Sequence, residues 1–383
     1  GRLLLTIAEA KRWKGDLEGA LGAAEQAAGL FPAGSRFWFG AIRECVAAHG
    51  RLGHKGAILP LGARALGVTA EPGAECAQIA ALIPAAVHLL YVGDVGAGNV
   101  LSERILALAQ KLPTLETLAR ARLCQLRALI AIHNHDLERA AQEHELARVA
   151  FELSGDTRAA ALASSNLGFT LLELGAHERA EEVLRATLST ARRLGLATIE
   201  PLALQNLGLV LARRGLFPEA AALQLDAAER FEARKDPRLA GSSRLHLALA
   251  HLAQGDAAAA RGESEGVLMS SFEPLHVGAW AVLSMVNLRN GDLEAALGHA
   301  RKAMNILERL GSIEEFELTA RLALAEALYA MGEADQAMHA LDGARGRIAG
   351  QVAKLSDPAM KKSFLERIPE HARVVELTGP IEA

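Results

Sequence analysis

Apolar helical runs alternate with short polar turns along the whole chain. A turn motif of glycine or a substitute, together with a polar residue, recurs between these runs, as in KGDLEGAL, NHDLERAA and NGDLEAAL. The nine turn positions are Gly15, Gly53, Gly93, His135, Gly175, Gly215, Gly255, Gly291 and Gly332. Their spacing is about 40 residues, which is typical of an array of stacked helix pairs.

Small residues recur at fixed distances from each turn. Seven residues before it, eight of the nine positions hold alanine, glycine or serine, and Val46 is the exception. Five residues after it alanine is the rule, and Ile58 and Gly98 depart from it. Close helix packing requires small residues, and a glycine can end the first helix in a left-handed turn. The pattern therefore predicts tight antiparallel helix pairs.

Two neighbouring units, Asn166 to Leu188 and Asn206 to Ala228, resemble tetratricopeptide repeats. The first unit places the small, Gly, Ala and Ala positions of that repeat at Gly168, Gly175, Ala180 and Thr187. The second unit places them at Gly208, Gly215, Ala220 and Ala227. The period exceeds the usual 34 residues, so the chain is similar to the variety with longer helices found in large bacterial regulators.

This resemblance implies an all-α fold: an α-solenoid, a right-handed superhelix of about nine helix pairs with a C-terminal capping helix. We expect divergent repeats over residues 1–117, regular repeats over 118–355, and the capping helix and tail over 356–383. Glycines together with Pro60 and Pro84 interrupt the helical pattern between residues 50 and 98, so we expect helix boundaries there to be shifted by several residues.

The closing segment begins with Ser356 and Asp357 as capping residues and Pro358 in the first helical turn. Its sequence SFLERIPEHARVVEL, residues 363–377, resembles the end of tetratricopeptide arms in large bacterial serine/threonine kinases or signal-transduction ATPases. The resemblance implies that a kinase or ATPase domain lies upstream in the same polypeptide. The opening residues Leu3 to Leu5 are typical of a helix that has already begun, which adds to the expectation that the chain is a fragment.

Composition and charge indicate how the core is built and which classes of partner to exclude. The chain is 51% hydrophobic but only 4% aromatic, so its core is built from alanine and leucine. A net charge of -4 provides no general attraction for nucleic acid or anionic lipid, and neither partner is expected. Three widely separated cysteines, Cys45, Cys76 and Cys124, fit a reducing, cytoplasmic location.

No catalytic motif, metal site or cofactor is predicted. The string GDVGAGNV, residues 93–100, lacks the lysine and the hydroxyl that a phosphate-binding loop needs after its last glycine. His133 and His135 are two residues apart and point away from each other if both lie in one helix, and His144 lies further along. We interpret the first two as solvated turn histidines and the cysteines as small buried hydrophobes.

The resemblance implies that the first helix of each unit lines a concave groove. Candidate partner-binding residues are Arg122, Gln125, Ser165, Asn166, Phe169, Gln205, Asn206, Leu209, Arg213 and His246. Asn166 and Asn206 occupy equivalent positions in adjacent repeats. Their amides could hold an extended peptide backbone or bridge neighbouring helices, and the sequence leaves both readings open.

Three functions remain open at this stage. The first is a regulatory arm of a larger bacterial signalling protein that binds a peptide or protein segment. The second is a stand-alone adaptor, and the third is a solenoid that senses a small molecule. No enzyme activity is expected of this chain.

Overall fold

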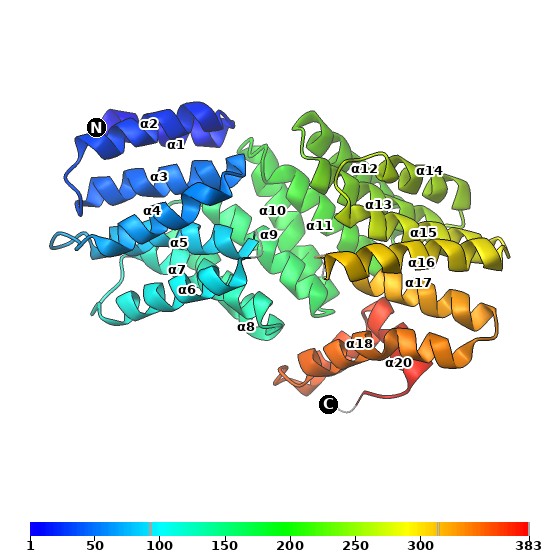
Figure 1. Ribbon diagram of the computed structural model, residues 1–383. Coiled ribbons are helices and arrows are strands. Elements are labelled where there is room, and N and C mark those ends of the chain that lie inside the picture. The colour runs from blue at the N-terminus through cyan, green and yellow to red at the C-terminus, as the bar shows by residue number, and fades with distance from the viewer. Residues whose placement is uncertain (92–93, 312, 314, 382–383) are drawn as a thin grey trace. The chain divides into compact units, whose positions relative to one another are not determined.

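The computed structural model describes residues 1–91, 94–311, 313 and 315–381, and these contain twenty helices and no strand (Figure 1). The helices are α1 (Arg2–Lys14), α2 (Leu17–Leu30), α3 (Arg36–Leu52), α4 (Lys55–Gly67), α5 (Glu75–Tyr91), α6 (Val95–Gln110), α7 (Thr117–His133), α8 (Leu137–Leu153), α9 (Thr157–Glu173), α10 (His177–Arg193), α11 (Glu200–Arg213), α12 (Phe217–Ala233), α13 (Pro237–Ala253), α14 (Ala257–Leu268), α15 (Pro274–Arg289), α16 (Leu293–Leu310), α17 (Glu317–Ala330), α18 (Ala334–Val352), α19 (Pro358–Glu366) and α20 (Pro369–Thr378). The first eighteen form nine consecutive pairs, which confirms the predicted all-α repeat.

The predicted turn residues end the first helix of each pair in a left-handed conformation. Gly15, Gly53, Gly175, Gly215, Gly255, Gly291 and Gly332 have φ values between 75° and 89°. His135 takes the same conformation with φ 55°. Gly93 lies outside the described residues. Glycine suits this position because it has no Cβ to clash with the neighbouring carbonyl.

An aspartate after the turn caps the second helix in several pairs. Asp16, Asp136, Asp256 and Asp292 each accept a hydrogen bond from the backbone N–H three residues ahead, at 2.9–3.1 Å. Such a cap satisfies an amide that has no partner within the helix. The short polar turn thus stops one helix and starts the next.

The recurring small residues lie where helices touch. The alanines seven residues before a turn, such as Ala128 and Ala248, and those five residues after it, such as Ala180 and Ala220, are all 0% exposed. A larger side chain at these points would separate the helices. The repeat is therefore specified by its contact points rather than by large core residues.

The chain forms two compact units. The N-terminal unit comprises Gly1–Asn134 and Gln142–Ala163, and the C-terminal unit comprises His135–Ala141 and Ser164–Ala383. This division rests on packing, whereas the boundary expected at residue 117 rests on repeat regularity, and that boundary stays a prediction.

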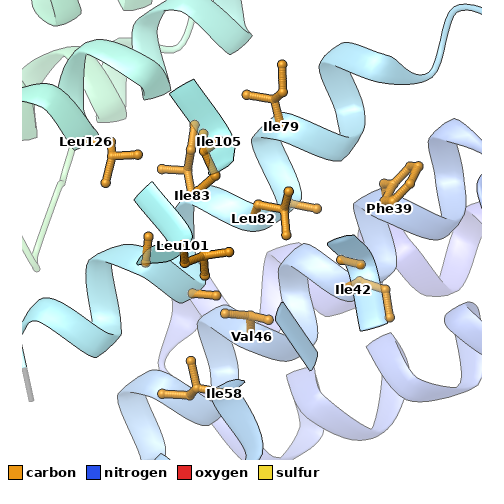
Figure 2. Packing of buried hydrophobic residues seen from close by; sticks show 14 of the residues in the cluster. Phe39, Ile42, Val46, Ile58, Ile79, Leu82, Ile83, Leu101, Ile105 and Leu126 are labelled. Carbon is orange, nitrogen blue, oxygen red and sulfur yellow. The ribbon is translucent and has the colours of Figure 1, made fainter. Parts of the chain in front are cut away.

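The core of the N-terminal unit brings together α3, α4, α5, α6 and α7. Figure 2 shows Phe39 and Ile42 from α3 near Leu82 from α5, and all three are at most 1% exposed. Trp38 is likewise buried in this core, whereas Phe37 is half-buried and stacks on the ring of Phe31. Leu3 at the start of α1 is 73% exposed.

Pro60 and Pro84 interrupt the sequence pattern but do not end the helices that contain them. α4 continues through Pro60 and α5 continues through Pro84. A proline removes one intrahelical donor and crowds the preceding turn. Packing compensates, since Ile58 and Ala65 of α4 and Leu82 and Ala85 of α5 are at most 1% exposed.

The closing segment is two short helices rather than one. The side chain of Asp357 accepts a hydrogen bond from the N–H of Ala359 at 2.8 Å, and α19 begins at Pro358, as predicted. Pro369 then starts α20, because proline disfavours helical geometry in the residue before it. Phe364, Ile368 and Val374 of this segment are buried and join the core of the C-terminal unit.

Candidate functional site

The predicted groove residues fall on the first helices of four consecutive pairs. Arg122 and Gln125 lie on α7 in the N-terminal unit. The other eight lie in the C-terminal unit, on α9, α11 and α13. We describe these eight first, because hydrogen bonds connect several of them.

Asn206 bridges two helices. Its Nδ2 donates to the backbone oxygen of Ser165 at 3.4 Å and lies 3.2 Å from the Oγ of the same residue. The amide therefore links α11 to α9, which is the second of the two roles left open by the sequence. Its Oδ1 accepts no hydrogen bond among the described residues, so the side chain keeps one acceptor.

Asn166 is different from Asn206 although the repeat makes them equivalent. Its side chain is half-buried and makes no hydrogen bond among the described residues. Phe169 lies one helical turn further along α9 and is 38% exposed, which is unusual for an aromatic ring. These two side chains provide an amide and an apolar surface on one helix.

Gln205 starts a chain of polar contacts across α11, α13 and the segment before α17. Its Nε2 donates to Ser242 Oγ at 3.0 Å, and Ser242 in turn donates to a carboxylate oxygen of Glu315 at 2.5 Å. The same Glu315 oxygen lies 3.4 Å from His246 Nε2. Ser242 and Gln205 are at most 5% exposed, so these contacts are buried and hold the side chains of the site in place.

Glu315 was missed by the sequence reasoning. It precedes α17, about 70 residues from Ser242, and no local motif marks it. Burial alone would raise its pKa, but hydrogen bonds from His246 and Ser242 together lower it. The next residue, Phe316, packs its ring 4.9 Å from that of His246 and has a left-handed φ of 66°. His246 is therefore held by Glu315 and Phe316 together.

Arg213 is already paired. Its Nη1 donates to Glu370 on α20, and the two side chains are 23% and 25% exposed. Burial opposes the charged form of Glu370, but the Arg213 guanidinium outweighs it and lowers the pKa of that carboxyl. Glu173 lies near the same pair. Partial loss of hydration, together with the negative charges of Glu370 and Glu315, raises the pKa of its carboxyl. The predicted groove position thus holds an acidic group of the chain itself.

The closing segment is fastened at further points. Ser363 Oγ donates to the backbone oxygen of Gly175 at 2.9 Å. Arg367 makes two hydrogen bonds with Glu178, at 2.6 and 2.8 Å. Arg373 makes two more with Glu326, at 2.5 and 3.0 Å. α19 and α20 therefore connect the α9–α10 turn, α11 and α17 within the C-terminal unit.

A polar cavity of about 360 Å³ lies beside this segment. Its lining residues are His177, Glu178, Arg213, Arg214 and Arg367. His177 is 2% exposed and its Nε2 has no hydrogen-bond partner. Burial, with the charges of Arg367 and Arg213, lowers its pKa to about 4, so the imidazole is neutral at pH 7. The charged lining suits a polar group of a ligand rather than an apolar molecule.

A sequence model of the tetratricopeptide repeat family matches residues 161–194, which span most of α9 and all of α10. The chain therefore contains a tetratricopeptide repeat within its array of helix pairs. No curated protein sequence matches it significantly.

Several solved structures share the fold of this repeat protein at low sequence identity. A Rap protein complexed with Competence and Sporulation Factor is 10% identical, with a TM-score of 0.62 over 88% of this chain and 98% of that one. The Rap conjugation gene regulator of plasmid pLS20, in complex with the Phr* peptide, is 13% identical, with a TM-score of 0.52 over 86% and 99%. Aspartyl phosphate phosphatase F from Bacillus subtilis is 13% identical, with a TM-score of 0.53 over 89% and 93%.

Two of the three cysteines of this repeat protein behave as apolar core residues. Cys45 and Cys124 are 3% and 4% exposed, as predicted, whereas Cys76 is only half-buried. Burial raises the pKa of the Cys45 thiol to about 12 and that of Cys124 to about 11. Both thiols therefore stay protonated and are poor nucleophiles at neutral pH.

Among the residues that the structure describes, no group of three or more histidine, cysteine, aspartate or glutamate side chains is arranged to hold a metal ion. Nor does any helix in the same residues combine the length and the apolar character required to cross a bilayer.

Proposed function

We propose that the chain is a non-catalytic interaction scaffold that binds a peptide or protein segment along α9, α11 and α13 of the C-terminal unit. The observation that carries this proposal is the pairing of a free Asn166 amide with the exposed Phe169 ring on one helix. A repeat-built surface of this type offers hydrogen bonds to a peptide backbone and an apolar contact for one side chain.

The similar structures support a peptide as the ligand. One of them holds Competence and Sporulation Factor and another holds the Phr* peptide. At 10–13% identity these likenesses establish a shared fold, and the ligand class is our inference for this chain.

The groove favours a ligand with an acidic group near its middle. Arg213 is the cation on this surface that pairs with a carboxylate of the closing segment, Glu370. A carboxylate on the ligand would take the place of Glu370 with the same charge-assisted geometry. Asn166 and Phe169 would then bind the neighbouring part of the ligand.

Binding to a selected peptide tests the proposal. Display selection against the full chain, followed by calorimetry, should yield peptides whose affinity falls about tenfold or more with Asn166→Ala or Phe169→Ala. Leu153→Ala is the matched control, because that leucine is 71% exposed and lies in the N-terminal unit. Equal affinities for all variants would reject this surface. Selection of no peptide, with a metabolite raising the melting temperature instead, would favour a small-molecule sensor.

We further propose that the scaffold regulates a larger bacterial signalling protein in the cytoplasm and has no enzyme activity of its own. The closing segment's likeness to kinase and ATPase arms supports a catalytic domain upstream, and the free thiols of Cys45 and Cys124 support a reducing compartment. One similar structure is named a phosphatase, so the direct test is hydrolysis of an aspartyl phosphate. Turnover by the purified chain would overturn the non-enzyme assignment.

A further inference from the structure

A cluster of arginines in the N-terminal unit surrounds one buried carboxylate. Glu44 on α3 is 1% exposed. Its Oε2 accepts a hydrogen bond from Arg12 Nε at 2.6 Å, and its Oε1 accepts two from Arg43, at 2.9 and 3.1 Å. Both oxygens of this buried carboxylate are thus occupied by Arg12 and Arg43.

Arg122 on α7 makes no hydrogen bond with this carboxylate. Its Nε is buried and has no hydrogen-bond partner, and the side chain forms no ion pair among the described residues. Burial and the repulsion from Arg43 lower the pKa of Arg122 to about 10, and Asp156 and Glu44 only partly offset them. The guanidinium is still charged at pH 7, so the unit holds a half-buried cation that makes no ion pair among the described residues.

Arg158 provides a fourth guanidinium and adds positive charge to this cluster. Arg12 and Arg158 lie over the ring of Trp13, at 4.4 and 4.5 Å from its centroid. Asp156 is the other nearby carboxylate, and it accepts a hydrogen bond from the N–H of Ala159 at 3.0 Å as the cap of α9. Four guanidiniums therefore share two carboxylates, each of which already has hydrogen-bond donors.

Such an arrangement is costly without a ligand. A half-buried charge loses hydration, and removing it or pairing it is favourable. A forked guanidinium matches the two oxygens of a carboxylate or phosphoryl group, and several guanidiniums can share one such anion. A neutral or apolar ligand would leave the surplus charge uncompensated.

We propose that the N-terminal unit binds an oxyanion, a carboxylate or phosphoryl group, between Arg122 and Arg43, with Arg12 and Arg158 adding positive potential. This site lies in a different unit from the peptide surface proposed above and does not depend on it. The sequence predicts Arg122 as a groove residue. Because its guanidinium makes no ion pair among the described residues, the ligand that it would bind is an anion.

The test uses the full chain with inorganic phosphate and succinate as probes, and chloride at the same ionic strength as the reference. In the wild type, phosphate at ten times its dissociation constant should raise the melting temperature by roughly 3 °C. A larger shift with phosphate identifies a phosphoryl ligand, and a larger shift with succinate identifies a carboxylate; equal shifts support the shared oxyanion chemistry.

The Arg122→Met variant distinguishes a binding role from a structural one, because the two roles predict different changes in stability without the probe and in the shift that the probe causes. Without the probe, the variant should be at least as stable as the wild type, since a desolvated cation is replaced by an apolar side chain of similar length. With the probe, its melting temperature should not rise. Arg120→Met is the matched control, because Arg120 is exposed on the same helix, and it should keep the full shift.

Arg122→Lys provides a second variant with the charge kept and the fork lost. Calorimetry should then show at least a tenfold loss of affinity for the more tightly bound probe. The proposal is overturned if the wild type shows no shift beyond the chloride reference, or if Arg122→Met lowers stability and leaves the shift intact.

Discussion

Arg213 on α11 donates a hydrogen bond to Glu370 on α20, although 157 residues separate them in the sequence. The pair fastens the closing segment to a helix whose neighbouring positions form the proposed peptide surface. In the proposed complex, an acidic group of the ligand and Glu370 of α20 would therefore compete for one guanidinium.

Replacement of Glu370 by glutamine should have two opposite effects. The free energy of unfolding should fall by about 1–2 kcal/mol, because the pair is only a quarter exposed and the remaining cation is left uncompensated. Affinity for an acidic peptide should rise, because Arg213 becomes free. Denaturant titration and calorimetry measure the two effects.

Glu376→Gln is the control for that experiment. Glu376 lies on the same helix, is 68% exposed, and pairs with Arg373 at 2.7 Å, so its loss should change stability by less than about 1 kcal/mol. Unchanged peptide affinity in Glu370→Gln would show that Arg213 takes no part in binding.

Acid should loosen the closing segment. Arg213 holds the pKa of Glu370 below its ordinary value of 4.5, and the hydrogen bonds from Arg367 lower the pKa of Glu178 to about 2. A carboxyl with a depressed folded pKa stabilises the fold above its unfolded pKa and loses that contribution as pH falls through the folded pKa. The loss should therefore develop between pH 4.5 and about 2.

Hydrogen exchange across residues 358–378 checks this dependence. After correction for intrinsic rates, protection there should fall as the pH is lowered from about 5 to about 2. Glu178→Gln combined with Glu370→Gln should remove most of the pH dependence of this segment. A segment equally protected at both pH values would contradict the assignment.

Asn206→Ala should destabilise the protein by about 1 kcal/mol, because the amide bridges α11 to Ser165 of α9. Asn166→Ala should change stability by less than about 0.5 kcal/mol, because that amide has no partner to lose. Thermal or denaturant unfolding of the two variants distinguishes the roles. Equal losses would mean that Asn166 also bridges helices.

The backbone of the turns gives a paired prediction. Gly215 has φ 77°, so Gly215→Ala should lower stability by about 1–2 kcal/mol. Lys235 takes φ 56° with a side chain, so Lys235→Gly should raise stability by up to about 1 kcal/mol. Chemical denaturation reports both, and a loss in the second variant would show that the lysine side chain offsets the strain.

Local features of the fold could be predicted from the sequence, and long-range ones could not. Turn glycines and buried alanines follow from backbone conformation and packing within one repeat, so a pattern about 40 residues long reveals them. Pro84 misleads a local reading, because tertiary packing keeps α5 continuous through it.

In the candidate site, too, only the local features could be predicted from the sequence. The repeat places Asn166 and Asn206 at equivalent positions, but only Asn206 has the Ser165 hydroxyl and carbonyl within reach. The roles of Glu315 and Glu370 depend on partners 73 and 157 residues away in sequence, and periodicity carries no information on such pairs.

The most direct test of the central claim is calorimetric titration of one selected peptide into the full chain and its Phe169→Ala, Glu370→Gln and Leu153→Ala variants. We predict weaker binding by about tenfold for Phe169→Ala, tighter binding of an acidic peptide for Glu370→Gln, and no change for Leu153→Ala. A peptide that binds all four proteins equally would contradict the proposed surface.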